Sequence, residues 1–204
     1  AKRRFINSAQ LQNIQLNDGV VTCNKIACSS DLNNYKKLQK ESIRGQVPFF
    51  YETNVGAGLP IIDTLKNLID SGDSVNSITA VLSGSLNFIF DSYNGTESFD
   101  SIVRKAMSGG YTEPDPRIDL SGLDVKRKLL ILARESGYPL EIEDIKTTPF
   151  LPEKAAKSTS IDDFLEALKA NESHFQSLFQ QANSNGKKLK FVAELIKDET
   201  GELI

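Results

Sequence analysis

The chain contains 204 residues, of which 39% are hydrophobic and 25% are charged, and these proportions are typical of a globular protein with a packed core. The formal net charge is −3 at pH 7 and the basic residues are dispersed, which argues against a nucleic-acid-binding surface because such a surface needs a concentrated basic face. Two cysteines and one histidine are too few for a structural zinc site, which takes about four such ligands.

The first predicted elements are a strand, a helix and a second strand. Residues 20–22 (Val-Val-Thr) form a short β-branched run that predicts a strand. Residues 29–31 (Ser-Ser-Asp) offer caps for a helix whose apolar residues, Leu32, Tyr35 and Leu38, recur at helical spacing. Residues 47–51 predict the next strand. This order is typical of a βαβ unit in an α/β sheet.

A loop at residues 52–60 leads into a second helix at 61–69, where apolar residues recur at i, i+3 and i+4. Residues 75–82 predict a strand, and residues 86–90 form a short, very apolar segment. A further helix is predicted over residues 99–106, closed by a pair of glycines. The middle of the chain therefore mixes helices with a strand.

The remaining elements are predicted with more helix than strand. Residues 111–121 contain two prolines and four ionisable side chains, so we expect irregular structure there. A strong helix at 123–136, a strand at 142–150 and a long helix at 161–183 follow, and a hairpin then pairs residues 189–196 with the last three residues. No apolar run approaches the ~18 residues that span a bilayer, so we expect a cytoplasmic protein without a membrane partner.

The most unusual stretch runs from Tyr111 to Lys128. Pro114 and Pro116 lock its loop, and a rigid loop with several carboxylates is costly because like charges repel. The following helix places Asp124 and Lys128 on one face, at the rim of the apolar stripe, from which a lysine can reach a cleft. Two simpler interpretations stay open: Asp124 completes a capping box, or it forms a surface pair with Lys128 worth about 0.3–0.5 kcal/mol.

A second stretch, residues 51–60, contains a GxG pattern. It is a weak nucleotide fingerprint, because Ile61 stands where the third glycine of GxGxxG belongs. Gly56 and Gly58 can instead free the backbone to turn its carbonyls inward, where Glu52 could join them around a hard cation. The simpler interpretation is a tight strand-to-helix turn. No GxGxxG occurs in the 204 residues, so we expect the pyrophosphate loop of any dinucleotide site to lie outside them.

These stretches occur in a fixed order that resembles homoserine dehydrogenase, particularly the version fused behind aspartokinase in bifunctional enzymes. The resemblance implies the C-terminal part of a Rossmann-like nucleotide-binding domain at residues 1–50, followed by an α+β substrate-binding and dimerisation domain at residues 51–204. The motifs that carry it are Asn24-Lys25, residues 51–60 (YETNVGAGLP), residues 82–90 (LSGSLNFIF) and residues 110–128 (GYTEPDPRIDLSGLDVKRK).

The resemblance implies reversible hydride transfer between L-homoserine and a nicotinamide cofactor, giving L-aspartate 4-semialdehyde on the route to threonine, methionine and isoleucine. Lys128 matches the family's proton donor at the reacting oxygen, and Lys25 and Asp124 complete the expected catalytic set. Glu113 and Asp124 match the carboxylates that hold homoserine, and Asp119 matches a further acidic position in the same cluster.

The resemblance also implies two bound groups besides the substrate. Lys25, with Asn24 beside it, matches a lysine near the nicotinamide of NADP or NAD. A sodium or potassium site matches the Glu52 side chain with the carbonyls of Val55, Ala57 and Leu59. The expected partners are therefore small molecules, a second copy in a homodimer and, in a full-length protein, a fused aspartokinase, with no nucleic acid.

The sequence leaves a second hypothesis open. A chain without the phosphate-binding turn would lack the helix N-terminus that holds a pyrophosphate, so we expect these 204 residues to bind NADPH poorly by themselves. In that case the chain would be a non-catalytic fragment that keeps the dimer scaffold and half of the substrate site. The acidic or basic residue that distinguishes NAD from NADP would also lie outside it.

Overall fold

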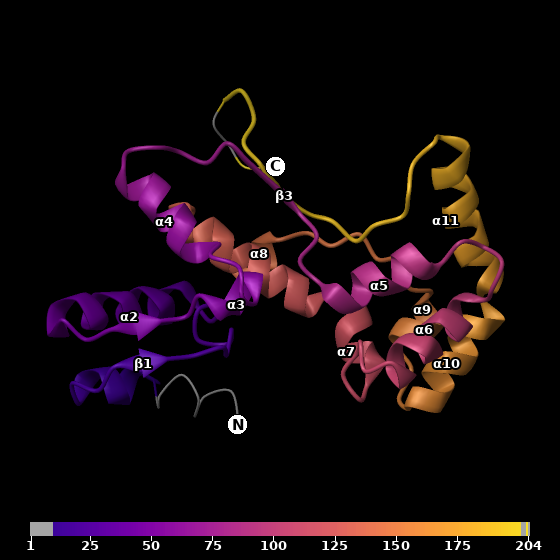
Figure 1. Cartoon of the computed structure of the whole chain (residues 1–204), viewed down its shortest axis with the longest axis horizontal. Helices are drawn as coiled ribbons and strands as arrows, with labels where there is room; N and C mark the ends of the chain where they lie inside the picture. The colour runs from indigo at the N-terminus through magenta and orange to yellow at the C-terminus, as the bar shows by residue number, and fades with distance from the viewer. Residues whose placement is uncertain (1–9, 201–202, 204) are drawn as a thin grey trace. The chain divides into compact units, whose positions relative to one another are not determined.

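The structure is a computed structural model that describes residues 10–200 and 203. The chain divides into two compact units: unit 1 comprises residues 1–82, 126–146 and 194–204, and unit 2 comprises residues 83–125 and 147–193 (Figure 1). The domain boundary near residue 50 stays a prediction. In the part of the chain that the structure describes, no helix is long and apolar enough to cross a membrane.

In unit 1, a helical segment at residues 10–15 is followed by a parallel βαβ unit. Strand β1 (Val20–Val21) pairs with strand β2 (Phe49–Phe50) in parallel, with Val20 opposite Phe49, and helix α2 (Leu32–Gly45) connects them. The ladder extends beyond the strands, since Thr22 N–H donates to the Phe50 carbonyl at 2.9 Å. A parallel pair needs such a crossover helix. The predicted strands, helix and α/β class are confirmed.

The ends of α2 follow from local chemistry. Asp31 is the N-cap, and its carboxylate accepts hydrogen bonds from the N–H groups of Asn33 and Asn34. At the other end, Gln46 adopts the left-handed conformation and its N–H donates to the last carbonyls of the helix. Between these caps the helix buries Tyr35 and packs the face that the spacing predicted.

The core of unit 1 also receives helix α8 (Leu123–Glu135), which begins in unit 2 and continues through unit 1. Ile131 and Leu132 of α8 belong to the same buried cluster as residues of β1, α2 and β2. The remaining elements with residues in unit 1 are α3 (Thr53–Gly56), α4 (Ile62–Asp70), β3 (Ser77–Ala80), the 3-10 helix η1 (Ile142–Asp144) and β4 (Ala193–Ile196), with β4 hydrogen-bonded to β3.

The two cysteines of the chain differ in burial, and we expect this difference to control their reactivity. Cys28 is fully buried in the unit 1 core, and burial, aided by the nearby Glu135 carboxylate, raises the pKa of its thiol to about 12. Cys23 is exposed. Because the thiolate is the reactive form, iodoacetamide at pH 8 should modify Cys23 and leave Cys28 untouched until the protein unfolds. Peptide mass spectrometry measures this, and rapid native labelling of Cys28 would contradict the packing described here.

Unit 2 is helical and has an aromatic core. Helix α10 (Ile161–Ala170) packs against α6 (Phe99–Ser108) and α9 (Glu153–Ala156), and α6 packs against α5 (Gly84–Ser92) (Figure 1). Phe99 on α6 stacks on Phe175 of α11 (Glu172–Ser184), with ring centroids 4.0 Å apart. Aromatic pairs contribute beyond the area they bury, so this stack helps to fix α6 and α11 against each other.

Three predictions about secondary structure were wrong. Residues 116–120 form a short helix, α7 (Pro116–Leu120), because Asp115 caps it and Pro116 suits its first turn. Residues 142–150 are not a strand: a capping box between Glu141 and Asp144 starts a single turn of 3-10 helix instead. The long helix expected over residues 161–183 is two helices, separated at Asn171.

The break at Asn171 coincides with a polar contact to another helix. The carboxylate of Glu172, the first residue of α11, accepts hydrogen bonds at 2.7 Å from Phe99 N–H and from the Tyr93 hydroxyl. Glu172 therefore caps the start of α6. If α10 and α11 were one continuous helix, the Phe99 N–H would need a different acceptor. For the predicted C-terminal hairpin, the structure shows β4 and an antiparallel bridge between Lys197 and Leu203. Residues 202 and 204 lie outside the described residues.

Candidate active site

Two of the motifs follow neighbouring parallel strands in unit 1. The turn with Asn24 and Lys25 comes after β1, and the loop with Glu52 comes after β2. Ligands of open α/β sheets bind outside the carboxyl ends of the strands. Both motifs are therefore placed where such a fold binds its ligands, and Asn24 and Lys25 are both partly exposed there.

The backbone around Lys25 is held by local hydrogen bonds. The Asn24 side chain accepts from Ile26 N–H at 2.9 Å, which closes a turn around Lys25. The carbonyl of Lys25 accepts from both the N–H and the hydroxyl of Ser29, at 2.9 and 2.8 Å. The lysine side chain therefore extends from a backbone that is already ordered.

The Glu52 side chain has a structural role in unit 1. Its two carboxylate oxygens accept from the N–H groups of Ile62 and Asp63, each at 2.8 Å, and so cap α4 from outside the helix. A carboxylate has about four lone-pair positions, so both oxygens can still accept a further partner. In the described part of the chain, no cluster of three or more His, Cys, Asp or Glu side chains could hold a metal ion. A cation at this loop would therefore depend on backbone oxygens.

The glycines of this loop do not act as the sequence suggested. Neither Gly56 nor Gly58 has a positive φ; Ala57 does, with φ 52° and ψ −112°. Leu59 N–H donates to the Gly56 carbonyl at 2.9 Å, which closes a tight turn with Ala57 in a conformation that favours glycine. Strain of this kind persists only where the surroundings enforce it.

Gly56 is required by packing. A Cβ added at Gly56 would lie 2.4 Å from Cγ1 of Ile61, whereas one at Gly58 would meet no atom within 4 Å. The turn thus brings the backbone of α3 against Ile61.

The Lys128 side chain hydrogen-bonds to the backbone of unit 1. Its Nζ donates to the Leu82 carbonyl at 2.7 Å, and its side chain is partly buried. Leu82 directly precedes Ser83, the N-cap of α5. The predicted proton donor is therefore ordered at the end of its long side chain, as catalysis requires.

The loop that precedes α7 has most of its charges paired within unit 2. Arg117 forms a two-pronged ion pair with Asp115, at 2.7 and 2.8 Å, and this hydrogen bonding lowers the pKa of the Asp115 carboxyl. Asp119 accepts a hydrogen bond from Glu113 N–H at 2.9 Å. Among the described residues, no hydrogen-bond or ion-pair partner of the exposed Glu113 carboxylate is found. Glu113 can therefore receive a cationic group from a ligand.

Asp119 holds the loop in place. Its second oxygen accepts from the hydroxyl of Ser85 on α5 at 2.8 Å, so its carboxylate joins α5 to the backbone of Glu113. Sequence reasoning placed Asp119 in the acidic cluster but gave Ser85 no role. The one available signal was the position of Ser85 in the Leu82–Phe90 motif.

We expect Ser85→Ala to loosen the Glu113 loop. The variant removes the α5 anchor of Asp119, and a hydrogen bond to a charged group contributes about 1.5–3 kcal/mol before water replaces it. Unfolding of unit 2 should then require about 1 kcal/mol less, and the KM for the substrate should rise several-fold. Ser92→Ala, a serine on the same helix, is the matched control. Equal effects of the two variants on KM would show that Asp119 does not need Ser85.

Asp124 lies partly exposed in the first turn of α8. Just before it, the Ser121 hydroxyl accepts from Leu123 N–H at 3.2 Å and so helps to start the helix. The predicted site residues are divided between the compact units: Glu113, Asp119 and Asp124 belong to unit 2, and Asn24, Lys25, Glu52, Val55, Ala57, Leu59 and Lys128 belong to unit 1.

Comparison with known proteins identifies one family. Residues 60–202 match the family model described as homoserine dehydrogenase. A bifunctional aspartokinase/homoserine dehydrogenase of Buchnera aphidicola is 47% identical over 182 residues, which is 89% of this chain and 22% of that protein. One from Zea mays is 43% identical over 176 residues, 86% of this chain and 19% of that protein. The chain thus spans about a fifth of the length of the curated relatives it matches.

Solved structures agree with the fold. A Candida auris protein of unknown function superposes with a TM-score of 0.87 and 31% identity, covering 97% of this chain and 57% of that one. A hyperthermophilic archaeal homoserine dehydrogenase in complex with NADPH gives a TM-score of 0.59 and 29% identity over 69% of this chain and 45% of that one. An Archaeoglobus fulgidus protein described as a putative homoserine dehydrogenase is 22% identical, with a TM-score of 0.74, and shows the shared fold.

Proposed function

This chain belongs to the homoserine dehydrogenase family, and on that premise we propose that it serves the reversible conversion of L-aspartate 4-semialdehyde to L-homoserine with a nicotinamide cofactor. The observation that carries the proposal is the pairing pattern in the Tyr111–Lys128 motif. Glu113 has an exposed carboxylate, and the Lys128 ammonium is fixed by the Leu82 carbonyl. The neighbouring Asp115 and Arg117 bind each other, and Asp119 binds α5 and the Glu113 backbone. The motif therefore combines an exposed carboxylate with a positioned ammonium, the two groups that the chemistry needs.

Lys128 is the proposed proton donor. Reduction of an aldehyde develops negative charge on its oxygen, and a fixed ammonium supplies both a proton and a positive charge to that atom. The hydrogen bond from Nζ to the Leu82 carbonyl fixes the position of this ammonium. In the reverse direction the neutral amine takes the proton of the homoserine hydroxyl.

Glu113 and Asp124 are the proposed ligands of the substrate's amino group. That group is an ammonium at neutral pH, and charge-assisted hydrogen bonds to carboxylates are short and strong. Asp119 contributes indirectly in this proposal, because its carboxylate is already shared between Ser85 and the backbone of Glu113. It fixes the loop from which Glu113 extends.

Asn24 and Lys25 are the proposed contacts to the cofactor. They fit that use because they follow the carboxyl end of a parallel strand, and their turn is ordered by hydrogen bonds. When bound, the nicotinamide would supply the hydride. The lysine ammonium suits a neighbouring carboxamide or phosphate oxygen, and we propose NADP, with NAD as the alternative.

A monovalent cation is proposed at the loop after β2. The Glu52 carboxylate and the carbonyls of Val55, Ala57 and Leu59 are all oxygen donors, which hard cations prefer. The strained Ala57 supports this assignment, because a cation that binds its carbonyl would offset the cost of a positive φ. The ion would have no redox part and would hold the loop beside α4.

Two partners are proposed from the relatives. The similar proteins of Buchnera aphidicola and Zea mays are bifunctional enzymes with aspartokinase, so we propose that the natural polypeptide also carries that activity. We further propose a homodimer. Size-exclusion chromatography with light scattering measures the oligomeric state directly.

The proposed function is tested by NADPH oxidation with L-aspartate 4-semialdehyde, measured with the complete polypeptide that carries these residues. Turnover with this substrate and at least about a hundredfold lower kcat/KM with succinic semialdehyde, which lacks the amino group, are expected because the charged clamp would lose its partner. Equal rates with the two aldehydes would contradict the roles of Glu113 and Asp124. Binding of homoserine without any turnover would instead identify a non-catalytic chain.

A further inference from the structure

A buried side chain from another element forms hydrogen bonds to the turn that carries Lys25. Asn54 on α3 is fully buried, and the two nearest acceptors to its amide are the carbonyl oxygens of Thr22 and Cys23. Only an amide nitrogen can bond a carbonyl oxygen, so the amide is oriented with Nδ2 toward them. Nδ2 then donates to both, each at 3.1 Å.

This contact joins two loops that lie far apart in the sequence. Asn54 lies two residues after Glu52, inside the proposed cation loop, whereas Thr22 and Cys23 directly precede Asn24 and Lys25. The carbonyls it binds belong to residues beyond the end of β1, where the parallel ladder no longer supplies donors. Asn54 thus continues the connection between the two strands by means of a side chain.

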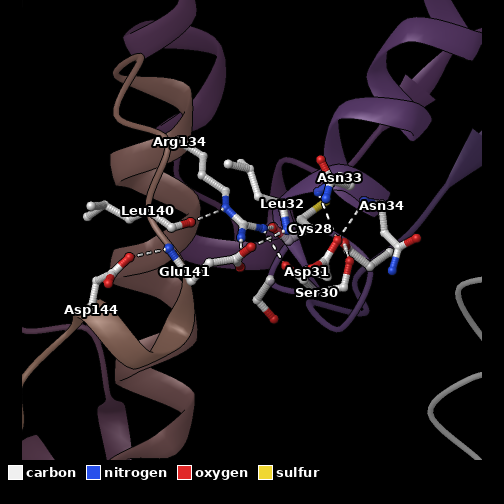
Figure 2. A network of polar contacts seen from close by, with 12 residues as sticks. Cys28, Ser30, Asp31, Leu32, Asn33, Asn34, Arg134, Leu140, Glu141 and Asp144 are labelled. Atoms are coloured by element: carbon white, nitrogen blue, oxygen red, sulfur yellow. Dashed lines mark hydrogen bonds and ion pairs between the residues drawn. The ribbon is translucent and has the colours of Figure 1, made fainter.

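A second buried side chain forms hydrogen bonds to the segment that follows this turn. Arg134 on α8 donates from Nη1 to the carbonyls of Cys28 and Ser30, at 3.0 and 2.7 Å, and its side chain is 1% exposed (Figure 2). Its other guanidinium nitrogens bind the Leu140 carbonyl and the Glu141 carboxylate. The segment from Thr22 to Ser30 is therefore anchored at both ends by buried donors, with Lys25 between them.

Burial makes the Asn54 contact specific. A buried amide without hydrogen bonds costs free energy that an apolar residue of similar volume would not, so Asn54 is stabilising only while its carbonyl partners stay in place. The contact consequently penalises any displacement of Thr22 and Cys23.

We propose that Asn54 is a positioning residue: its amide fixes the Thr22–Lys25 turn to the Glu52–Leu59 loop and so sets the place of Lys25 relative to the bound nicotinamide. This inference rests on the cofactor role that the proposed function gives to Lys25. It makes the cation loop and the cofactor lysine one rigid assembly. Movement of the loop is transmitted to Lys25 through Asn54.

The test compares two substitutions at Asn54 with a matched core substitution. Asn54→Leu removes both donors at similar volume, and Asn54→Asp keeps the shape but places acceptors against the carbonyls. Val47→Ala is the control, because Val47 is buried in the same core and its backbone hydrogen-bonds to Ser42 of α2. The exchange rates of the Asn24 and Ile26 amides are measured relative to those of the β2 amides. This ratio should rise about tenfold in both Asn54 variants and should stay unchanged in the control.

Kinetics supply the second measurement. A turn displaced by about 1 Å costs on the order of a hundredfold in rate, so kcat/KM for NADPH should fall by ten- to a hundredfold in the Asn54 variants while KM for the semialdehyde stays within about twofold. Unchanged exchange at the turn, or the same change in Val47→Ala, overturns the proposal. If the wild-type protein has no activity but the turn still exchanges faster in the Asn54 variants, the positioning role of Asn54 is supported and the proposed function is rejected instead.

Discussion

Lys128→Ala is expected to lower kcat by about 10²–10⁴-fold, the range that a positioned general acid contributes. The side chain is partly buried and its Nζ is fixed by the Leu82 carbonyl at 2.7 Å, so the variant loses a proton donor that is held in place. The measurement is kcat for NADPH oxidation with L-aspartate 4-semialdehyde. Circular dichroism should show an unchanged fold, because the substitution removes a side-chain hydrogen bond and leaves the backbone of α8 intact.

The control for this variant is on the same helix. Lys126→Ala removes an equal charge two residues away, which turns it roughly 200° around the helix from Lys128. Its activity should stay within about twofold of the wild type. Lys128→Arg should be nearly as inactive as the alanine variant, because a guanidinium keeps the charge but does not release its proton. Retention of more than about a tenth of the activity in Lys128→Ala would contradict the proton-donor role.

Arg134→Met is expected to lower the free energy of unfolding by about 3 kcal/mol, the largest effect on stability that we predict. The guanidinium is almost fully buried and serves three carbonyls and one carboxylate (Figure 2). Methionine fills much of the same space, yet it leaves the carbonyls of Cys28 and Ser30 without a donor. Glu141 keeps its other partners, since it also accepts from Leu32 N–H at 2.9 Å and forms the capping box with Asp144.

Chemical denaturation of the variant and of Arg44→Met measures this difference. Arg44 is exposed in the last turn of α2, where a cation contributes only about 0.3–1 kcal/mol through the helix dipole. A loss below about 1 kcal/mol in Arg134→Met would mean that water or another donor replaces the guanidinium, and that the network does not anchor the turn.

The elements that the sequence predicted well are those with independent local signals. Helix α2 has an acidic N-cap at Asp31 and apolar residues at helical spacing, and the structure contains both features. The parallel pairing of Val20 with Phe49 follows from two β-branched or aromatic runs joined by that helix. Local capping chemistry and hydrophobic period pointed the same way in these elements, so tertiary contacts had nothing to override.

The wrong elements were decided by contacts that single residues do not reveal. Residues 142–150 were predicted as a strand, but Glu141 bonds to Arg134 and to Leu32 N–H and turns the chain there. The helix expected over residues 161–183 divides at Asn171 because Glu172 binds the start of α6. Both carboxylates look like ordinary surface charges in the sequence.

The candidate site shows the same limit. The motif resemblance identified the residue types, including Glu113 and Lys128, but it did not distinguish structural roles from chemical ones. Asp119 holds a loop, and Asn54 and Ser85 were missed, because their partners lie more than thirty residues away in the chain. Gly56 and Gly58 were predicted to free the backbone to turn its carbonyls inward, whereas neither has a positive φ and Gly56 is needed for packing. The one signal for Asn54 was its position in the motif at residues 51–60, which follows β2.

The most direct test of the account follows the hydride itself. NADPH carrying deuterium on the transferred position of C4 is incubated with L-aspartate 4-semialdehyde and the complete polypeptide, and the product is analysed by mass spectrometry and NMR. The account predicts L-homoserine with one deuterium on C4, formed by the wild type and by Lys126→Ala, with product formation by Lys128→Ala reduced as its kcat predicts. Homoserine without deuterium, or no homoserine while NADPH and substrate both bind, would contradict it.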